Sequence, residues 1–172
     1  MYRLGLLILL LLMIVSCRKE GCMDINSASY DPGAKVNDGM CTYCYLRTIT
    51  VKSMDSRQDA YTPWDGDDGT GPDLQFSIVK DYGQEVPYPD LVTEIKYDVE
   101  HFPVTWDIPI SGNEEYLQTE MTYSFKLVEV DREGEVLIYE GTFCPREDYT
   151  DGKIALSKSV LNVAIELDYI EF

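Results

Sequence analysis

Residues 161–169 read LNVAIELDY, and this stretch shows the pattern that decides the fold. Large apolar side chains stand at every second position, and Asn162, Glu166 and Asp168 are polar between them. Because successive side chains of a β-strand point to opposite faces of a sheet, this alternation predicts a strand with one buried face. The same period of two recurs upstream, with almost no helical period, in residues 48–52, 74–78, 91–99, 104–108, 123–127 and 136–143.

These stretches predict an all-β domain over residues 46–172. Segments rich in Gly, Pro and Asp separate them and supply the turns. About seven or eight short strands in such an arrangement are typical of an antiparallel β-sandwich.

Length and charge exclude several classes of function. The chain has 172 residues, enough for one ordinary domain with additions at its ends. It carries 31 acidic and 14 basic side chains, a formal charge of −17. That charge excludes nucleic acid as a partner, because phosphate binding requires a basic surface. It also argues against unaided binding to anionic lipid.

The N-terminus has the features of an export signal. Arg3 precedes an apolar run from Leu4 to Val15, which is too short for a membrane-spanning helix of about 20 residues. The run ends in Ile14-Val15-Ser16-Cys17, which resembles the lipobox of bacterial lipoproteins. The resemblance implies a signal peptide over residues 1–16 and a lipid on Cys17 that anchors the mature chain to a membrane. An ordinary secretory signal with a coincidental cysteine is the alternative.

The residues after Cys17 bear on the destination of the protein. Residue 18 is Arg, whereas an Asp there marks retention in the inner membrane in some bacterial lipoproteins. Arg18-Lys19-Glu20 resembles, with one acid where two are usual, a signal for display on the cell surface. We therefore expect an outer-membrane lipoprotein that faces the periplasm or the cell surface.

Four further cysteines predict two disulfides, because an exported protein meets an oxidising environment. Four cysteines allow three connectivities, and we favour Cys22–Cys41 with Cys44–Cys144. The first would close a loop of about 20 residues and stabilise the fold by roughly 3 kcal/mol. Cys41 and Cys44 also have C-x-x-C spacing, but a second cysteine pair or nearby His that would complete a zinc site is missing from the sequence.

Residues 21–43, GCMDINSASYDPGAKVNDGMCTY, resemble a short cysteine-bounded repeat of bacterial surface and secreted proteins. The resemblance predicts a small disulfide-stapled spacer module over residues 17–45, between the lipid and the domain. A segment this short cannot bury a core of its own, which explains the staple. Asp24, Asp31 and Asp38 could bind calcium, but we interpret them as turn residues.

Residues 46–172 resemble the C2 domain, an eight-stranded β-sandwich that often binds calcium and lipid through loops at one end. LRTITVKS (46–53), GPDLQFSIV (71–79), FPVTW (102–106) and LVEVD (127–131) carry this resemblance. Trp64-Asp65 and Gly71-Pro72-Asp73 match a variant of the same sandwich in bacterial lipoproteins, with a longer spacer between the two motifs.

The resemblance implies a calcium site in acidic loops. Residues 65–73 read DGDDGTGPD, and carboxylates on a Gly-rich backbone suit calcium. The implied ligands are Asp65 or Asp68 with Asp73 from the first loop, and Glu129 with Asp131 from a later one. Glu129 replaces an expected Asp, and Glu133 and Glu135 are loose candidates for a further ligand. The alternative is a solvated turn in a protein that is acidic throughout.

Two functions from different classes remain open. The first is a non-catalytic, membrane-anchored lipoprotein that binds a protein or glycan or has a structural role, with calcium in its acidic loops. The second is a carbohydrate-binding or glycan-processing accessory lipoprotein in which Trp64 or Trp106 would stack on sugars. Catalytic motifs of the common hydrolase and nucleotide-binding families are missing from the sequence, and we interpret the single histidine, His101, as a turn residue. We expect a monomer.

Overall fold

A computed structural model describes residues 18–55, 57, 62–64, 70–80, 91–109, 117–132, 134–158 and 162–171. Residues 1–16 and Cys17 therefore lie outside the described part of the chain. In that part no helix is long and apolar enough to cross a membrane, and α2 (Pro145–Asp148) has four residues.

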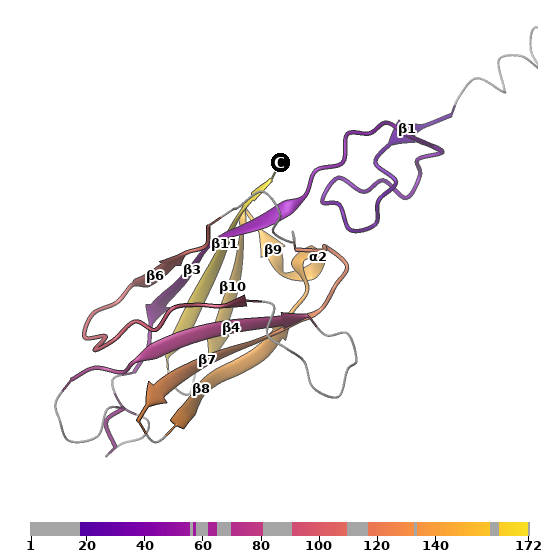
Figure 1. The fold of residues 1–172 in the computed structure, drawn as a ribbon. Coiled ribbons are helices and arrows are strands. Elements are labelled where there is room, and N and C mark those ends of the chain that lie inside the picture. Colours follow the sequence, from indigo (N-terminus) through magenta and orange to yellow (C-terminus); the bar gives the residue numbers. More distant parts are fainter. Residues whose placement is uncertain are drawn as a thin grey trace, which may run out of the picture.

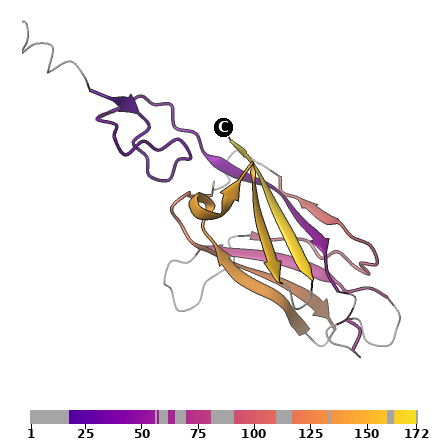
Figure 2. The same ribbon diagram turned by 180° about the vertical axis from the view of Figure 1, so that it is seen from behind.

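The domain is a sandwich of two antiparallel sheets, as the alternating pattern predicts (Figures 1 and 2). The first sheet has the order β6 (Val104–Asp107), β3 (Cys44–Ser53), β11 (Val163–Glu171), β10 (Lys153–Lys158), β9 (Tyr149–Thr150). The second sheet has the order β5 (Leu91–Val92), β4 (Leu74–Lys80), β7 (Tyr123–Asp131), β8 (Gly134–Phe143).

The core lies between these sheets and consists of the inward side chains of the long strands. Phe76 stacks on Phe125 with ring centroids 5.7 Å apart, and Tyr139 meets the edge of Phe125 at 5.1 Å. From the facing sheet, Ile165 and Leu167 are fully buried. Each such apolar side chain contributes about 1.5–3 kcal/mol by leaving water, so this face holds the two sheets together.

One predicted strand is wrong over most of its length. Residues 91–99 alternate like a strand, but β5 ends at Val92, and Tyr97 is exposed although the pattern assigns it to the buried face. The backbone departs from extended geometry at Asp98, whose φ is +51°. Thr93 and Lys96 still bond to the backbone of β4, and Val99 is buried, so the segment stays beside β4 but without the regular pairing of a strand.

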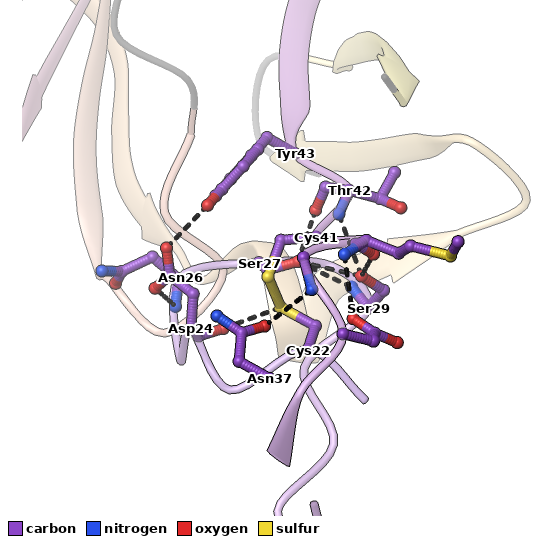
Figure 3. The surroundings of a disulfide bond; sticks show 12 residues. Cys22, Asp24, Asn26, Ser27, Ser29, Asn37, Cys41, Thr42 and Tyr43 are labelled. Carbon is purple, nitrogen blue, oxygen red and sulfur yellow. Dashed lines mark hydrogen bonds between the residues drawn. A yellow bond between two sulfur atoms is a disulfide. The ribbon is translucent and has the colours of Figure 1, made fainter. Parts of the chain in front are cut away.

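The N-terminal module forms from turns and a disulfide. Cys22 and Cys41 are bonded, with their Cα atoms 5.0 Å apart, which confirms the first predicted pair (Figure 3). The parallel pair β1 (Glu20–Gly21) and β2 (Val36–Asn37) forms its small sheet. Turn residues bond to nearby amides, as expected for Asp31, whose Oδ1 accepts from Gly33 at 2.9 Å.

The predicted second disulfide is absent. Cys44 and Cys144 are not joined, and the Cys144 Sγ instead donates to the carbonyl oxygen of Thr119 at 3.4 Å. Segment 117–119 lies against both residues, because the Cys144 thiol is directed at Thr119 and the Leu117 amide donates to the backbone carbonyl oxygen of Cys44 at 2.9 Å. The Cys144 thiol is therefore engaged by this segment and not by Cys44.

Candidate functional site at the acidic loop end

The two acidic loops of the sequence lie at one end of the sandwich, which we call the acidic loop end. The first loop connects the end of β3 to the beginning of β4, and the later one is the turn between β7 and β8. Leu74 at the beginning of β4 pairs with Glu129 near the end of β7, so antiparallel pairing places both loops together. Figure 1 shows these strand ends at the lower left, opposite the N-terminal module.

Asp73 already has a structural role at this end. Its Oδ1 accepts a hydrogen bond from the backbone amide of Asp98 at 2.8 Å, and its carbonyl oxygen accepts one from Val130 at 2.8 Å. The first bond holds the left-handed turn at Asp98, a conformation that Asp tolerates better than most residues. One carboxylate oxygen of this predicted ligand is therefore engaged within the protein.

Glu129 is the predicted ligand with the most unusual surroundings. It lies on the inward face of β7, 1% exposed, beside Leu127 and opposite Leu74. A carboxylate buried among apolar side chains is costly unless hydrogen-bond donors or a cation compensate its charge. Asp131, two residues further along β7, is exposed and accepts a hydrogen bond from the amide of Arg132 through Oδ1.

The other predicted ligands, Asp65 and Asp68, lie outside the described residues, as does Glu133. Asp55 and Trp64 in the same loop are described. The indole Nε1 of Trp64 donates to the carbonyl oxygen of Asp55 at 2.8 Å, and the Asp55 carboxylate accepts from the side-chain amide of Asn162 at 2.8 Å. These two bonds tie the loop to its own beginning and to the end of the β10–β11 turn.

Within the described part of the chain, His, Cys, Asp and Glu side chains form no group of three or more that could hold a metal ion. The strands bring Asp73, Glu129 and Asp131 to one end, but these three do not make up a site by themselves. A complete site would need further ligands from outside the described residues.

Sequence reasoning missed Asp98 and the role of Gly71 at this end. A Cβ atom at position 71 would lie 2.1 Å from the carbonyl oxygen of Val99, so only glycine allows this approach. Pro72 is buried, and its carbonyl oxygen accepts from the Val99 amide at 3.1 Å. The Gly-Pro-Asp motif thus fixes segment 98–99 against β4. A glycine three residues before a strand is the available sequence signal for so close an approach.

Trp64, Trp106 and His101, which were considered for sugar binding or catalysis, lie in surroundings that do not suit these roles. Trp64 and Trp106 are both buried, and Trp106 donates its Nε1–H to the carbonyl oxygen of Glu94 at 2.9 Å. Neither indole face is therefore open to a sugar. The His101 side chain is 92% exposed, and its Nε2 lies 4.0 Å from a carboxylate oxygen of Glu100.

Comparison with known proteins gives structural neighbours alone. No protein-family model matches the chain, and no curated protein matches it. It is similar to the structure of human GIVD cytosolic phospholipase A2 with methyl gamma-linolenyl fluorophosphonate and terbium chloride, at 11% identity and a TM-score of 0.45. The structure of the same enzyme with that inhibitor alone is similar at 11% identity and a TM-score of 0.43. The matches cover 76% and 74% of this chain but only 18% and 17% of those chains.

Proposed function

We propose that this chain is a non-catalytic lipoprotein of the outer membrane, anchored through Cys17, whose acidic loop end binds calcium and a partner. The observation that supports it is the placement of Asp73, Glu129 and Asp131 at one end of a rigid sandwich. Carboxylate oxygens are the ligands that calcium prefers, and loops on a rigid scaffold are a common position for binding residues. Asp65 and Asp68 would supply the further ligands.

The burial of Glu129 distinguishes it from the acids of a purely solvated turn. A solvated turn would leave its acids in water, where no compensation is needed. Glu129 is instead 1% exposed at the inward face of this same end. Glu129 also has an interaction partner within the protein, and a calcium ion bound by the loops would add to that interaction.

The anchor is tested by metabolic labelling of growing cells with palmitate. We expect label in the full chain and none in Cys17→Ala, because the thiol is the acceptor of the lipid. Cys44→Ala is the matched control and should keep the label. A labelled Cys17→Ala variant would overturn the anchor. Separately, protease treatment of intact cells decides whether the anchored chain faces the cell surface or the periplasm.

Calcium binding is tested by thermal unfolding of the full chain. A ligand that binds the folded state stabilises it by RT ln(1 + [L]/Kd). Calcium at a concentration ten times its Kd should therefore raise the free energy of unfolding by about 1.4 kcal/mol. We expect the melting temperature to rise with calcium and to return on chelation. An unchanged melting temperature at millimolar calcium would remove calcium from the proposal and leave the anchor untouched.

A further inference from the structure

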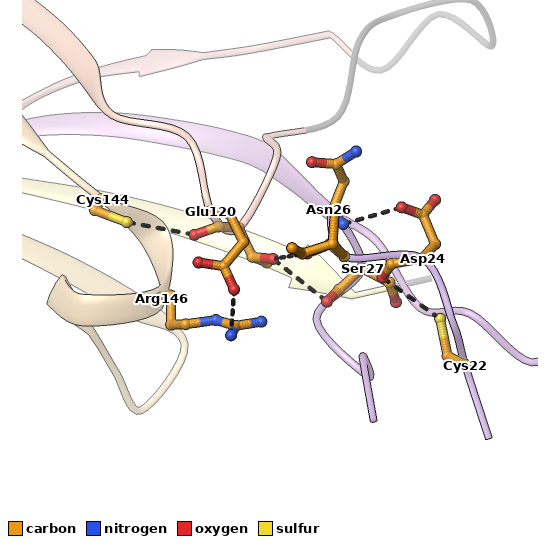
Figure 4. A network of polar contacts seen from close by, with 9 residues as sticks. Cys22, Asp24, Asn26, Ser27, Glu120, Cys144 and Arg146 are labelled. Atoms are coloured by element: carbon orange, nitrogen blue, oxygen red, sulfur yellow. Dashed lines mark hydrogen bonds and ion pairs between the residues drawn. The ribbon is translucent and has the colours of Figure 1, made fainter. Parts of the chain in front are cut away.

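The N-terminal module lies directly against the sandwich. The Thr119 hydroxyl lies within hydrogen-bond distance of the carbonyl oxygens of Ile25 at 3.2 Å and Ser27 at 3.3 Å. Figure 4 shows Ser27 of the module near Glu120, the residue that follows Thr119. The Thr119 amide donates to the carbonyl oxygen of Asn26 at 3.4 Å. Thr119 and Ser27 are both buried. Segment 25–27 therefore docks on the sandwich with its backbone oxygens turned toward the hydroxyl and the amide of one threonine.

A second contact lies beside the first. The Arg146 guanidinium stacks over the ring of Tyr30, 5.7 Å from its centroid, and pairs with the carboxylate of Glu120. The Arg146 amide donates to the Thr119 carbonyl oxygen at 3.0 Å, so α2 is tied to the same docking site. Arginine above an aromatic ring adds attraction that is strongest where water is partly excluded.

The two residues between the disulfide and β3 are also held. The Thr42 carbonyl oxygen accepts from the Ser27 hydroxyl at 2.6 Å and from the Ala28 amide at 2.8 Å, and its amide donates to the Ser29 hydroxyl at 2.9 Å. Tyr43 donates its hydroxyl to Asp24 Oδ2 at 2.8 Å (Figure 3). The junction is thus bonded to the module instead of forming a free linker.

Residues 18 and 19 alone separate Cys17 from β1. Two extended residues reach only about 7 Å, so a lipid on Cys17 would hold the module close to the membrane. From Cys44 the ten residues of β3 lead away from the module to the acidic loop end. At the usual rise of a strand, that distance is about 30 Å.

We propose that the module is a fixed mount, docked on Thr119 and Arg146, which holds the acidic loop end away from the membrane that anchors the chain. The proposal rests on the lipid anchor proposed above and goes beyond it. In this orientation the acidic loops face away from the anchoring bilayer. A partner of these loops would then approach from the side opposite the membrane.

Hydrogen exchange of the full chain tests the docking without reference to the anchor. We expect the amides of residues 24–30 to be protected, and Thr119→Ala to speed their exchange by at least about fivefold, since its hydroxyl contact is lost. Thr142→Ala, at an exposed position of β8, is the control and should leave them unchanged. Unprotected amides at 24–30, or exchange that Thr119→Ala does not alter, would overturn the mount.

Energy transfer from tryptophan to a dansyl-labelled lipid headgroup tests the orientation in vesicles. The reporters are Met40→Trp in the module, 77% exposed, and Tyr97→Trp at the acidic loop end, 68% exposed, each corrected for the signal of Trp64 and Trp106. We expect several-fold stronger transfer from position 40, with and without calcium. Equal transfer would overturn the orientation. A chain that does not float with the vesicles would show that the anchor itself is wrong, while hydrogen exchange still decides the docking.

Discussion

Gly71 lies so close to Val99 that a Cβ atom at position 71 would stand 2.1 Å from the Val99 carbonyl oxygen. The obstacle is backbone, which cannot move aside as a flexible side chain would. The contact holds segment 98–99 at the beginning of β4, where Asp73 bonds to the Asp98 amide. The shape of the acidic loop end therefore depends on a glycine outside any strand.

Gly71→Ala should destabilise the domain by about 1–3 kcal/mol, the usual cost of forcing extra volume into a packed site. Chemical denaturation of the full chain measures this loss. Gly39→Ala is a useful comparison, because Gly39 has a φ of +72° but nothing within 4 Å of its Cβ position. That variant should lose about 1 kcal/mol from backbone conformation alone. Equal stability of Gly71→Ala and the parent chain would refute the close approach.

Two substitutions at Asp73 separate its structural role from a role in calcium binding. Asp73→Ala removes the acceptor for the Asp98 amide and should cost about 1 kcal/mol. Asp73→Asn keeps an acceptor oxygen and should stay within about 0.5 kcal/mol of the parent chain, while the loss of charge weakens calcium binding. Denaturation with and without calcium measures both effects. An Asp73→Asn variant with the parent response to calcium would remove Asp73 from the ligand set.

The sandwich was predictable because its long strands bury one face each. Phe125 and Leu127 follow the period of two that one buried face imposes. Residues 91–99 show the same period, yet regular pairing ends at Val92, and Gly71 and Asp73 hold an irregular backbone at Asp98 and Val99. Contacts between residues about 25 positions apart have no signature in a local pattern.

The cysteines and acids show a similar limit. An even number of cysteines indicates that pairing can occur, but the count does not reveal that segment 117–119 contacts both Cys44 and Cys144. Likewise, the acidic pattern indicates candidate ligands, yet the burial of Glu129 and the engaged oxygen of Asp73 depend on strand register. The sequence indicated which residues were candidates, but it could not predict their burial or their hydrogen-bond partners.

Replacing both Cys22 and Cys41 with alanine should release the module before the sandwich unfolds. A bridge that closes a loop of about 20 residues contributes roughly 3 kcal/mol, and the module has little core to replace it. Hydrogen exchange should become fast in residues 20–41 and stay slow in β4 and β7. Unchanged protection of the module would show that docking alone holds it.

The module should also loosen in acid. The backbone amide of Asn26, followed by the Tyr43 hydroxyl, lowers the pKa of Asp24 below its ordinary value of 3.8. A carboxyl whose folded-state pKa is lowered adds stability above its unfolded pKa, and this stability is lost as the pH falls through the folded-state value. Protection of amides 24–30 should therefore fall below about pH 4, the ordinary carboxyl range. Asp24→Asn should flatten that fall, and a variant as acid-sensitive as the parent would exclude Asp24 as its source.

Isothermal titration of the full chain with calcium, with Glu129→Gln and Glu140→Gln beside it, tests the central claim most directly. Glu140 is exposed on β8 and serves as the matched control for the loss of one charge. The account predicts saturable binding by the parent and by Glu140→Gln, and affinity at least tenfold weaker, about 1.4 kcal/mol, for Glu129→Gln. No saturable heat at millimolar calcium, or equal binding by all three, would contradict a calcium site at the acidic loop end.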